Sequence, residues 1–199
     1  MRSHGSVATS FPRTLRWLAA VVVSLAALFG PQAAGSAAAA ADSSCSDVEV
    51  VFARGTFEAP GVGATGQAFV DALNARLGGK AVDVYGVDYP ASLDFQAATY
   101  GIADAANKIQ AIATSCARTQ IVLGGYSQGA AVAGYTTTDT VPAGIALPDG
   151  VSGTLPPAVA SHFAAVVLFG TPSDGFLNLV AHDAPPITIG HLFTAKTLE

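Results

Sequence analysis

Short apolar runs alternate along the chain with segments of helical periodicity. Runs of β-branched and other apolar residues at 48–53, 81–87, 121–124 and 165–169 predict four strands. Apolar residues three or four positions apart predict helices between and after them. The expected helices cover about residues 69–77, 94–116 and 128–135, with a loop at 142–157 and a last short strand within 187–198. Strands alternating with helices form parallel sheets covered on both faces. The pattern predicts an α/β fold, a three-layer α/β/α sandwich with a central, mainly parallel sheet.

The first 41 residues have the order of regions that is typical of a secretory signal peptide. Their three charged residues are all arginine, an apolar run follows at 15–30, and alanines at 39–41 form a small-x-small cleavage signature. The most apolar part, 18–29, has 12 residues and falls short of the ~20 that span a bilayer, which argues against stable membrane insertion. We expect residues 1–41 to be removed on export and residues 42–199 to form one secreted domain.

The segment after residue 41 is acidic and poor in charge. Its 158 residues contain six Lys and Arg against 14 Asp and Glu, a net charge of −8. A domain without a basic patch does not match a nucleic-acid-binding protein, and its apolar composition argues against intrinsic disorder. No pair of His or Cys has the spacing of metal ligands, so neither a metal nor a cofactor is expected.

Cys45 and Cys116 are the two cysteines of the chain. An even number of cysteines in an exported protein predicts a disulfide, because the compartment is oxidising. The alternative is two buried free thiols. A bridge closing a loop of this length would stabilise the fold by about 4 kcal/mol in the chain-entropy model.

Residues 125–129, Gly-Tyr-Ser-Gln-Gly, match the pattern of a nucleophile elbow. In an elbow the nucleophile sits on a strained turn between a strand and a helix, and glycines on either side remove side chains that would clash. The predicted strand immediately before and the predicted helix immediately after supply the context that this motif requires. We interpret Ser127 as the nucleophile rather than as part of an ordinary strand-to-helix turn.

An oxyanion hole needs two backbone N–H groups near that serine. One is expected from Gln128, the residue after the nucleophile. The other is expected from a loop after an early strand, where Arg54-Gly55-Thr56 follows the first strand. Glycine allows close approach of the backbone, and the Thr56 hydroxyl is a further donor. The alternative is a simple turn that ends the strand.

These pieces together resemble the cutinase family, in particular the cutinase-like proteins of mycobacteria. The resemblance covers nearly all of residues 45–199, and its pieces occur in the right order, with a fitting spacing from Cys116 to Ser127. The matching pieces are Cys45 before the first strand, residues 52–56 (Phe-Ala-Arg-Gly-Thr), residues 125–129 and residues 168–170 (Leu-Phe-Gly).

The resemblance implies a small α/β-hydrolase without a lid that hydrolyses carboxylic esters, from short acyl esters to lipids and polyesters. It implies Ser127 as the nucleophile, Thr56 and Gln128 as the oxyanion hole, and a disulfide between Cys45 and Cys116. The implied substrate is an ester or a lipid.

A serine hydrolase also needs a base and a carboxylate that orients it. In the cutinase family both follow the serine, in a segment with a second disulfide that has no match here. The chain stops about where that segment should begin, so we expect a fragment or shortened product, or a natural short form. Asp174 with His182 or His191 would satisfy the chain order of an α/β-hydrolase. We interpret these residues, together with Asp183 and His162, as loop and surface residues.

Two functions follow from this sequence. The first is a secreted serine esterase; the alternative is a weakly active or inactive hydrolase remnant that binds lipid or a cell-wall partner, because losing the base costs about a millionfold in kcat. Residues 61–66 also fit a dinucleotide-binding fingerprint superficially. The acidic partner of that fingerprint is met only loosely by Asp83 or Asp88, so we expect these glycines to form the loop before the first helix.

Overall fold

The computed structural model describes residues 45–140, 153–180 and 187. Its strands form one parallel sheet in the order β2-β1-β3-β4. The bounds are Val48–Ala53 for β1, Val82–Gly86 for β2, Gln120–Tyr126 for β3 and Phe163–Phe169 for β4. All four predicted strands are present. The predicted signal peptide and most of the predicted last strand lie outside the described residues.

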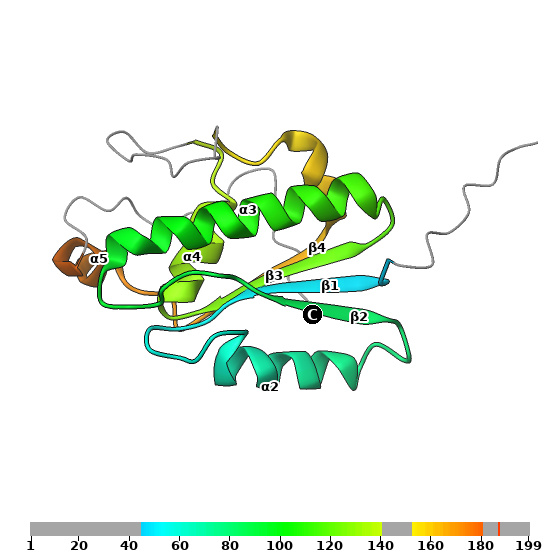
Figure 1. Ribbon diagram of the computed structural model, residues 1–199, viewed down its shortest axis with the longest axis horizontal. Helices are drawn as coiled ribbons and strands as arrows, with labels where there is room; N and C mark the ends of the chain where they lie inside the picture. Colours follow the sequence, from blue (N-terminus) through cyan, green and yellow to red (C-terminus); the bar gives the residue numbers. More distant parts are fainter. Residues whose placement is uncertain (1–44, 141–152, 181–186, 188–199) are drawn as a thin grey trace, which may run out of the picture. The chain divides into compact units, whose positions relative to one another are not determined.

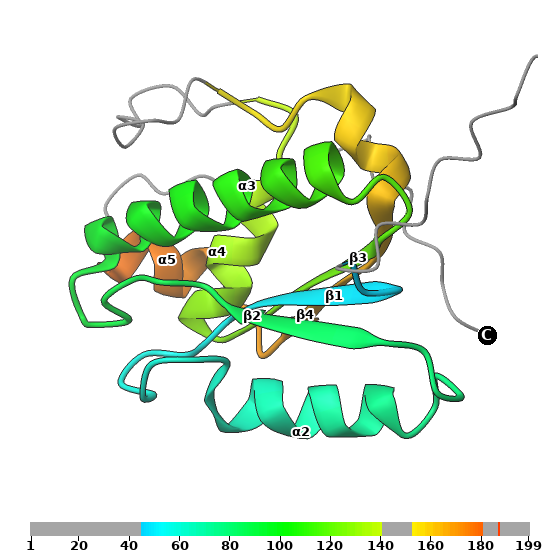
Figure 2. The same cartoon turned by 45° about the vertical axis from the view of Figure 1, so that its right-hand side comes forward.

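Helices cover both faces of the sheet. Figures 1 and 2 show α2 on one face and α3 and α4 on the other, which confirms the three-layer α/β/α arrangement. The bounds are Gly63–Asn74 for α2, Ala98–Ser115 for α3, Gln128–Thr136 for α4 and Asp174–Val180 for α5. Two 3₁₀ helices, η1 (Phe95–Ala97) and η2 (Pro157–His162), precede α3 and β4. The sequence did not predict α5, and it placed Gly63 in a loop although α2 begins there.

The central strand β1 divides the core into two clusters. Val51 and Ala53 belong to the cluster that includes α3 and α4, whereas Val50 and Phe52 belong to the cluster with α2. Alternate residues of a strand point to opposite faces, so one short strand contributes to both. On the α2 side the ring of Phe52 lies 6.1 Å from that of Phe69 and 6.3 Å from that of Phe169. These rings join α2, β1 and β4.

The strand order places a topological switch point between β1 and β3. The chain leaves β1 toward α2 on one face and leaves β3 toward α4 on the other (Figure 1). In open α/β sheets, ligands bind at the carboxyl ends of neighbouring strands whose connections diverge in this way. The ends of β1 and β3, where Ala53 pairs with Gly125, are therefore the place where this fold is expected to bind a ligand.

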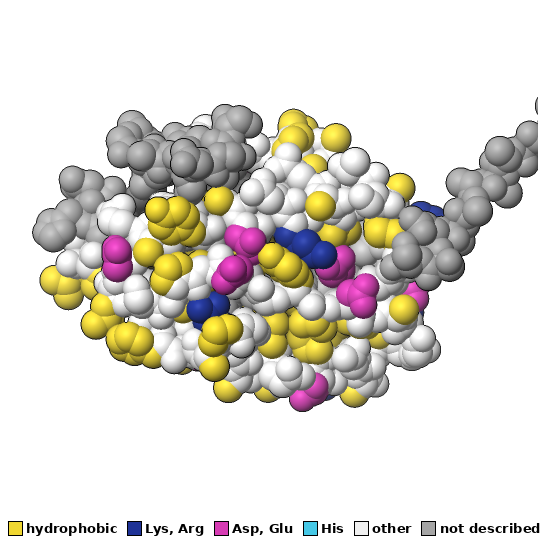
Figure 3. Space-filling view, viewed as in Figure 1, with side chains coloured by type: hydrophobic (Ala, Val, Ile, Leu, Met, Phe, Trp, Pro, Cys, Tyr) yellow, Lys and Arg dark blue, Asp and Glu magenta, His cyan; other side chains and the backbone are white. Residues whose placement is uncertain are grey.

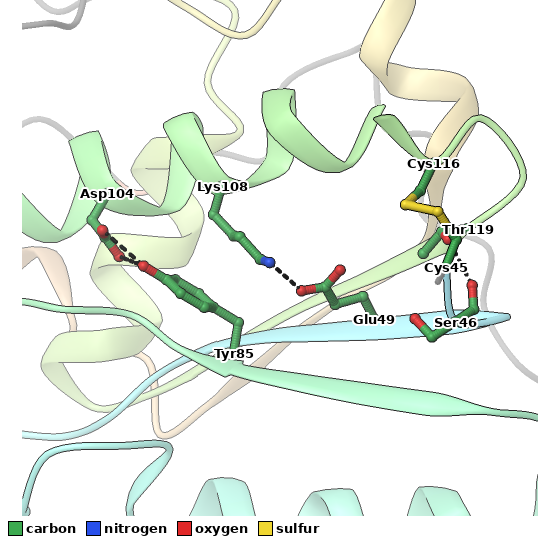
Figure 4. Close-up of polar contacts among 8 residues, drawn as sticks. All are labelled: Cys45, Ser46, Glu49, Tyr85, Asp104, Lys108, Cys116 and Thr119. Carbon is green, nitrogen blue, oxygen red and sulfur yellow. Dashed lines mark hydrogen bonds and ion pairs between the residues drawn. A yellow bond between two sulfur atoms is a disulfide. The ribbon is translucent and has the colours of Figure 1, made fainter. Parts of the chain in front are cut away.

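The opposite, amino end of the sheet is fastened by a disulfide and hydrogen bonds (Figure 4). Cys45 and Cys116 form the expected bridge, with Cα atoms 5.7 Å apart. Beside it the buried Thr119 hydroxyl donates to the Ser46 carbonyl at 2.6 Å. The segment before β1 is thus joined to the end of α3 through Cys45 and to the start of β3 through Ser46.

A polar cluster lies between α3 and the first two strands (Figure 4). Lys108 on α3 contacts the Glu49 carboxylate at 2.6 Å and lies over the Tyr85 ring. The Tyr85 hydroxyl donates to Asp104, and burial, together with that carboxylate, raises the pKa of Tyr85 to about 12. Each charged side chain between α3 and the sheet therefore has a partner: Glu49 pairs with Lys108, and Asp104 accepts from Tyr85.

Acidic and apolar side chains separate the few basic ones on the face shown in Figure 3. In the described part of the chain, no helix is both long and apolar enough to span a bilayer.

Candidate active site

Ser127 occupies a strained turn between β3 and α4. Its backbone has φ 53° and ψ −117°. Residues other than glycine rarely adopt a positive φ. The Ser127 N–H donates to the Phe169 carbonyl at 2.9 Å, and the Ser127 carbonyl accepts from Ala130 at 2.9 Å. The turn is therefore held from β4 on one side and from the first turn of α4 on the other. This is the backbone geometry of a nucleophile elbow.

The two glycines of the motif are required by packing. A Cβ on Gly125 would lie 2.0 Å from the Gly129 carbonyl oxygen, inside the turn itself. A Cβ on Gly129 would lie 2.0 Å from the Ala53 carbonyl oxygen and 2.5 Å from that of Arg54. The start of α4 thus packs directly against the end of β1. This contact brings the elbow next to the loop after β1.

That loop, residues 54–58, is anchored by the buried Arg54 side chain. Its guanidinium donates to the backbone carbonyls of Glu58 at 2.9 Å, Val87 at 3.2 Å and Tyr89. It also lies over the Tyr89 ring, and the Tyr89 hydroxyl donates back to the Arg54 carbonyl. Burial raises the pKa of Tyr89 to about 12, although the Arg54 charge acts in the opposite direction. The loop is therefore fixed to the segment after β2.

Thr56 lies within this anchored loop, and Gln128 opens α4. A Cβ on the neighbouring Gly55 would lie 2.8 Å from the Tyr126 ring, so the loop also approaches the elbow closely. Gln128 is buried, and its side-chain amide donates to the Ser92 carbonyl at 2.9 Å. The three residues predicted from the sequence, Thr56, Ser127 and Gln128, therefore sit on adjoining turns at the switch point.

Of the other candidates for a base and a carboxylate, the structure describes His162 and Asp174. His162 ends η2 just before Phe163, which pairs with Ile121 at the start of β3. It therefore lies at the amino end of the sheet, away from Ser127. Asp174 begins α5 after the carboxyl end of β4 and is exposed. Burial raises the pKa of Tyr135, and the negative charge of Asp174 raises it further. His182, Asp183 and His191 lie outside the described residues.

The glycines at 61–66 have structural roles. Gly61 and Gly63 have φ of 109° and 69°, and a Cβ on Gly66 would lie 2.6 Å from the Phe52 ring. The Glu58 carboxylate accepts the Ala64 N–H at 2.7 Å. In a dinucleotide site a phosphate takes that place at the helix N-terminus. The chain's own carboxylate fills it, which argues against the fingerprint.

Sequence reasoning missed the residues that hold the loop, namely Arg54, Glu58 and Tyr89. Their contacts join segments that follow different strands, and neither spacing nor periodicity reports such contacts. The one signal in the sequence was an arginine directly after an apolar strand and before Gly55-Thr56. A charged side chain buried at such a place needs hydrogen-bond partners. Among residues 45–140, 153–180 and 187, no group of three or more His, Cys, Asp or Glu is arranged to hold a metal ion.

Comparisons with known proteins show which family and which folds the chain resembles. A family model described as Cutinase matches residues 44–196. Carboxylesterase Culp1 of Mycobacterium tuberculosis is 45% identical over 189 residues, which cover 94% of this chain and 80% of that protein. A Trichoderma reesei cutinase in complex with a phosphonate inhibitor matches with a TM-score of 0.52 at 33% identity, over 74% of this chain and 58% of the other.

The catalytic core domain of acetyl xylan esterase from Trichoderma reesei shares the fold. It matches with a TM-score of 0.50 at 23% identity, over 64% of this chain and 65% of the other. The α/β-hydrolase fold and the family match lead to one assignment: the chain belongs to the cutinase family.

Proposed function

We propose that this chain is a secreted serine esterase in which Ser127 is the nucleophile. Membership of the cutinase family, with its carboxylesterase relatives, makes it a carboxylic ester hydrolase. The observation that carries the assignment of Ser127 is its positive φ at the switch point, between two glycines that have no room for a side chain. This geometry presents the hydroxyl at the N-terminus of α4, where the helix dipole favours negative charge.

In the proposed reaction the Ser127 hydroxyl oxygen attacks the carbonyl carbon of an ester. The carbonyl electron pair moves to oxygen, and the resulting oxyanion accepts hydrogen bonds from the backbone N–H groups of Gln128 and Thr56. The carbon–oxygen bond to the alcohol then breaks, and the alcohol leaves with the proton that the Ser127 hydroxyl has lost. Water hydrolyses the acyl-enzyme, which releases the acid and returns a proton to Ser127. His162, the one histidine among the described residues, lies at the other end of the sheet and is no base for this step.

Exposed aromatic side chains, one in the elbow and one in the loop after β1, support an ester with an apolar acyl group, including a lipid. Tyr126, which precedes Ser127, is 37% exposed, and Phe57, which follows Thr56, is 74% exposed. Exposed aromatic side chains beside a reactive group provide surface for an apolar substrate. The Cys45–Cys116 disulfide supports export, because disulfides persist in oxidising compartments. We propose accordingly that residues 1–41 are a signal peptide and residues 42–199 the hydrolase domain.

Covalent labelling tests the assignment of Ser127. We expect a fluorophosphonate probe to modify the folded wild-type protein and Ser127→Ala to abolish the modification. Ser161→Ala is the matched control, because Ser161 is exposed and lies at the amino end of the sheet. Turnover of p-nitrophenyl esters should disappear in Ser127→Ala alone, which would also exclude a non-catalytic remnant. Labelling that persists in Ser127→Ala would refute the assignment.

A further inference from the structure

The Glu58 carboxylate joins two segments that meet beside the proposed oxyanion hole. One oxygen accepts the Gly55 N–H at 2.6 Å, in the loop after β1. The other accepts the Ala64 N–H at 2.7 Å, in the first turn of α2. Hydrogen bonds to an ionised carboxylate are stronger than those between neutral groups. A single side chain therefore ties the loop to a helix that packs against the sheet.

Two glycines make room for this carboxylate. A Cβ on Gly63 would lie 2.4 Å from a Glu58 carboxylate oxygen, and a Cβ on Gly55 would lie 3.2 Å from the same oxygen. Val62, the residue at the N-cap position of α2, provides no side-chain cap. Glu58 supplies both the missing acceptor and a negative charge at the positive end of the helix. The carboxylate is thus part of the packing and caps α2 from outside the helix.

The backbone of Glu58 closes the same loop from the other side. Its N–H donates to the Gly55 carbonyl at 3.2 Å, and its carbonyl accepts from the Arg54 guanidinium at 2.9 Å. Phe57 donates its N–H to the Ala91 carbonyl at 2.7 Å and has a φ of 65°. Thr56 lies between amides that all have acceptors within the protein. The direction of the Thr56 N–H therefore depends on Glu58 through Gly55, whose N–H and carbonyl both contact Glu58.

We propose that Glu58 is a positioning residue for the oxyanion hole, whose carboxylate fixes the direction of the Thr56 N–H by joining Gly55 to the first turn of α2. This inference rests on the proposed role of Thr56 in ester hydrolysis. Glu58 acts through the backbone and touches no substrate. Its loss should therefore lower kcat and leave KM nearly unchanged, because the donor acts on charge that develops in the transition state.

Glu58→Gln is the first variant, because it keeps the length of the side chain and replaces one acceptor by an NH₂ group that faces an N–H. We expect kcat for p-nitrophenyl butyrate and the rate of fluorophosphonate labelling to fall about 10- to 100-fold, the size of effect that a displaced catalytic group produces. Glu58→Asp keeps the charge but is too short to join both amides. It should show a similar loss if position matters, and near wild-type activity if only charge matters, which would overturn the proposal.

Glu49→Gln is the matched control, because Glu49 is also a carboxylate with a partner, Lys108, but it is buried and lies toward the amino end of β1. It should lower the unfolding midpoint without changing kcat. A folded Glu58→Gln protein with unchanged kcat, or with a raised KM alone, would contradict the positioning role.

Hydrogen exchange separates this inference from the proposed function. Amide exchange at Gly55–Phe57 should become faster in Glu58→Gln than in Glu49→Gln at equal global stability. If the wild-type protein is not labelled at Ser127, the proposed function fails and the exchange result still decides whether Glu58 orders the loop. Equal exchange in the two variants would overturn the inference.

Discussion

The two ends of the sheet are held by different means. At the amino end a disulfide, a buried threonine hydroxyl and an ion pair join β1 to α3 and β3. At the carboxyl end Ser127 and Phe57 have positive φ. Backbone hydrogen bonds hold the Ser127 turn, and the contacts of Arg54 and Glu58 hold the loop that contains Phe57, without a covalent link at either place. Strained backbone persists only where surrounding contacts over-determine it. The contacts at the amino end therefore stabilise the fold, whereas those at the carboxyl end hold an unfavourable backbone geometry that lowers stability.

The largest effect is expected from Gly129→Ala at the carboxyl end. The new Cβ would lie 2.0 Å from the Ala53 carbonyl oxygen and push α4 away from β1. We expect labelling of Ser127 to fall about 1,000-fold, the upper range for losing an oxyanion donor, with a free energy of unfolding lower by about 4 kcal/mol. Gly175→Ala on α5 is the control, since its Cβ meets nothing within 4 Å. Equal labelling of both variants would show that the close approach is not needed.

At the amino end, replacing Cys45 and Cys116 by serine should lower the free energy of unfolding by about 4 kcal/mol. The bridge spans 71 residues, and its loss relaxes the unfolded chain. Urea unfolding measures this change. The labelling rate of the protein that remains folded should equal that of the wild type. A slower rate would mean that the amino end also sets the geometry of the site.

Tyr89→Phe tests the carboxyl end more mildly, because it removes only the hydroxyl that donates to the Arg54 carbonyl. We expect a loss of about 1 kcal/mol at neutral pH. In the wild type Tyr89 ionises near pH 12 when folded and near pH 10 when unfolded, so the unfolded chain loses its proton first. Stability should therefore fall between pH 10 and pH 12 and be unaffected by this group below pH 10.

Unfolding midpoints from pH 8 to pH 12 check this prediction, and the fall should be shallower in Tyr89→Phe. Tyr85→Phe is the control, because the pKa of Tyr85 is also raised to about 12 but its hydroxyl donates to Asp104, away from the loop. The Tyr85 variant should flatten the pH profile and keep the labelling rate. Identical profiles for wild type and Tyr89→Phe would contradict the assigned shift.

The smallest overall effect is expected from Thr119→Val at the amino end, because only stability should change. The substitution keeps the shape of a buried side chain and removes the hydrogen bond to the Ser46 carbonyl. We expect a loss of about 1 kcal/mol and no change in labelling. Thermal unfolding measures the first and the probe reaction the second. A lower labelling rate in folded Thr119→Val would contradict the contrast, because it would mean that the amino end also affects the site.

Local signals made the strands and the elbow predictable from the sequence. The runs at 48–53 and 165–169 fall on β1 and β4, and the motif at 125–129 lies on a strand-to-helix turn. The start of α2 was missed because its cap comes from Glu58, outside the helix, and Val62 gives no capping signal. Helix α5 was missed because it is short, with the single buried residue Leu177.

The supports of the site were not predictable for a related reason. Arg54 donates to backbone carbonyls after β2, and any residue type supplies a carbonyl, so no side-chain pattern marks the partner. The separation of His162 from Ser127 likewise depends on which end of β4 each one borders. Such distances depend on the order and direction of the strands in the sheet. Packing of the whole fold determines both, and no local sequence pattern reports them.

The disulfide also determines how the domain bears mechanical load. A tether attached ahead of Cys45 would pull on the sulfur–sulfur bond and the end of α3 before it could peel β1 from its neighbours. Because Cys45 and Ser127 border opposite ends of the sheet, anchoring the protein to a bead or a resin through that side would leave the serine facing the bulk liquid.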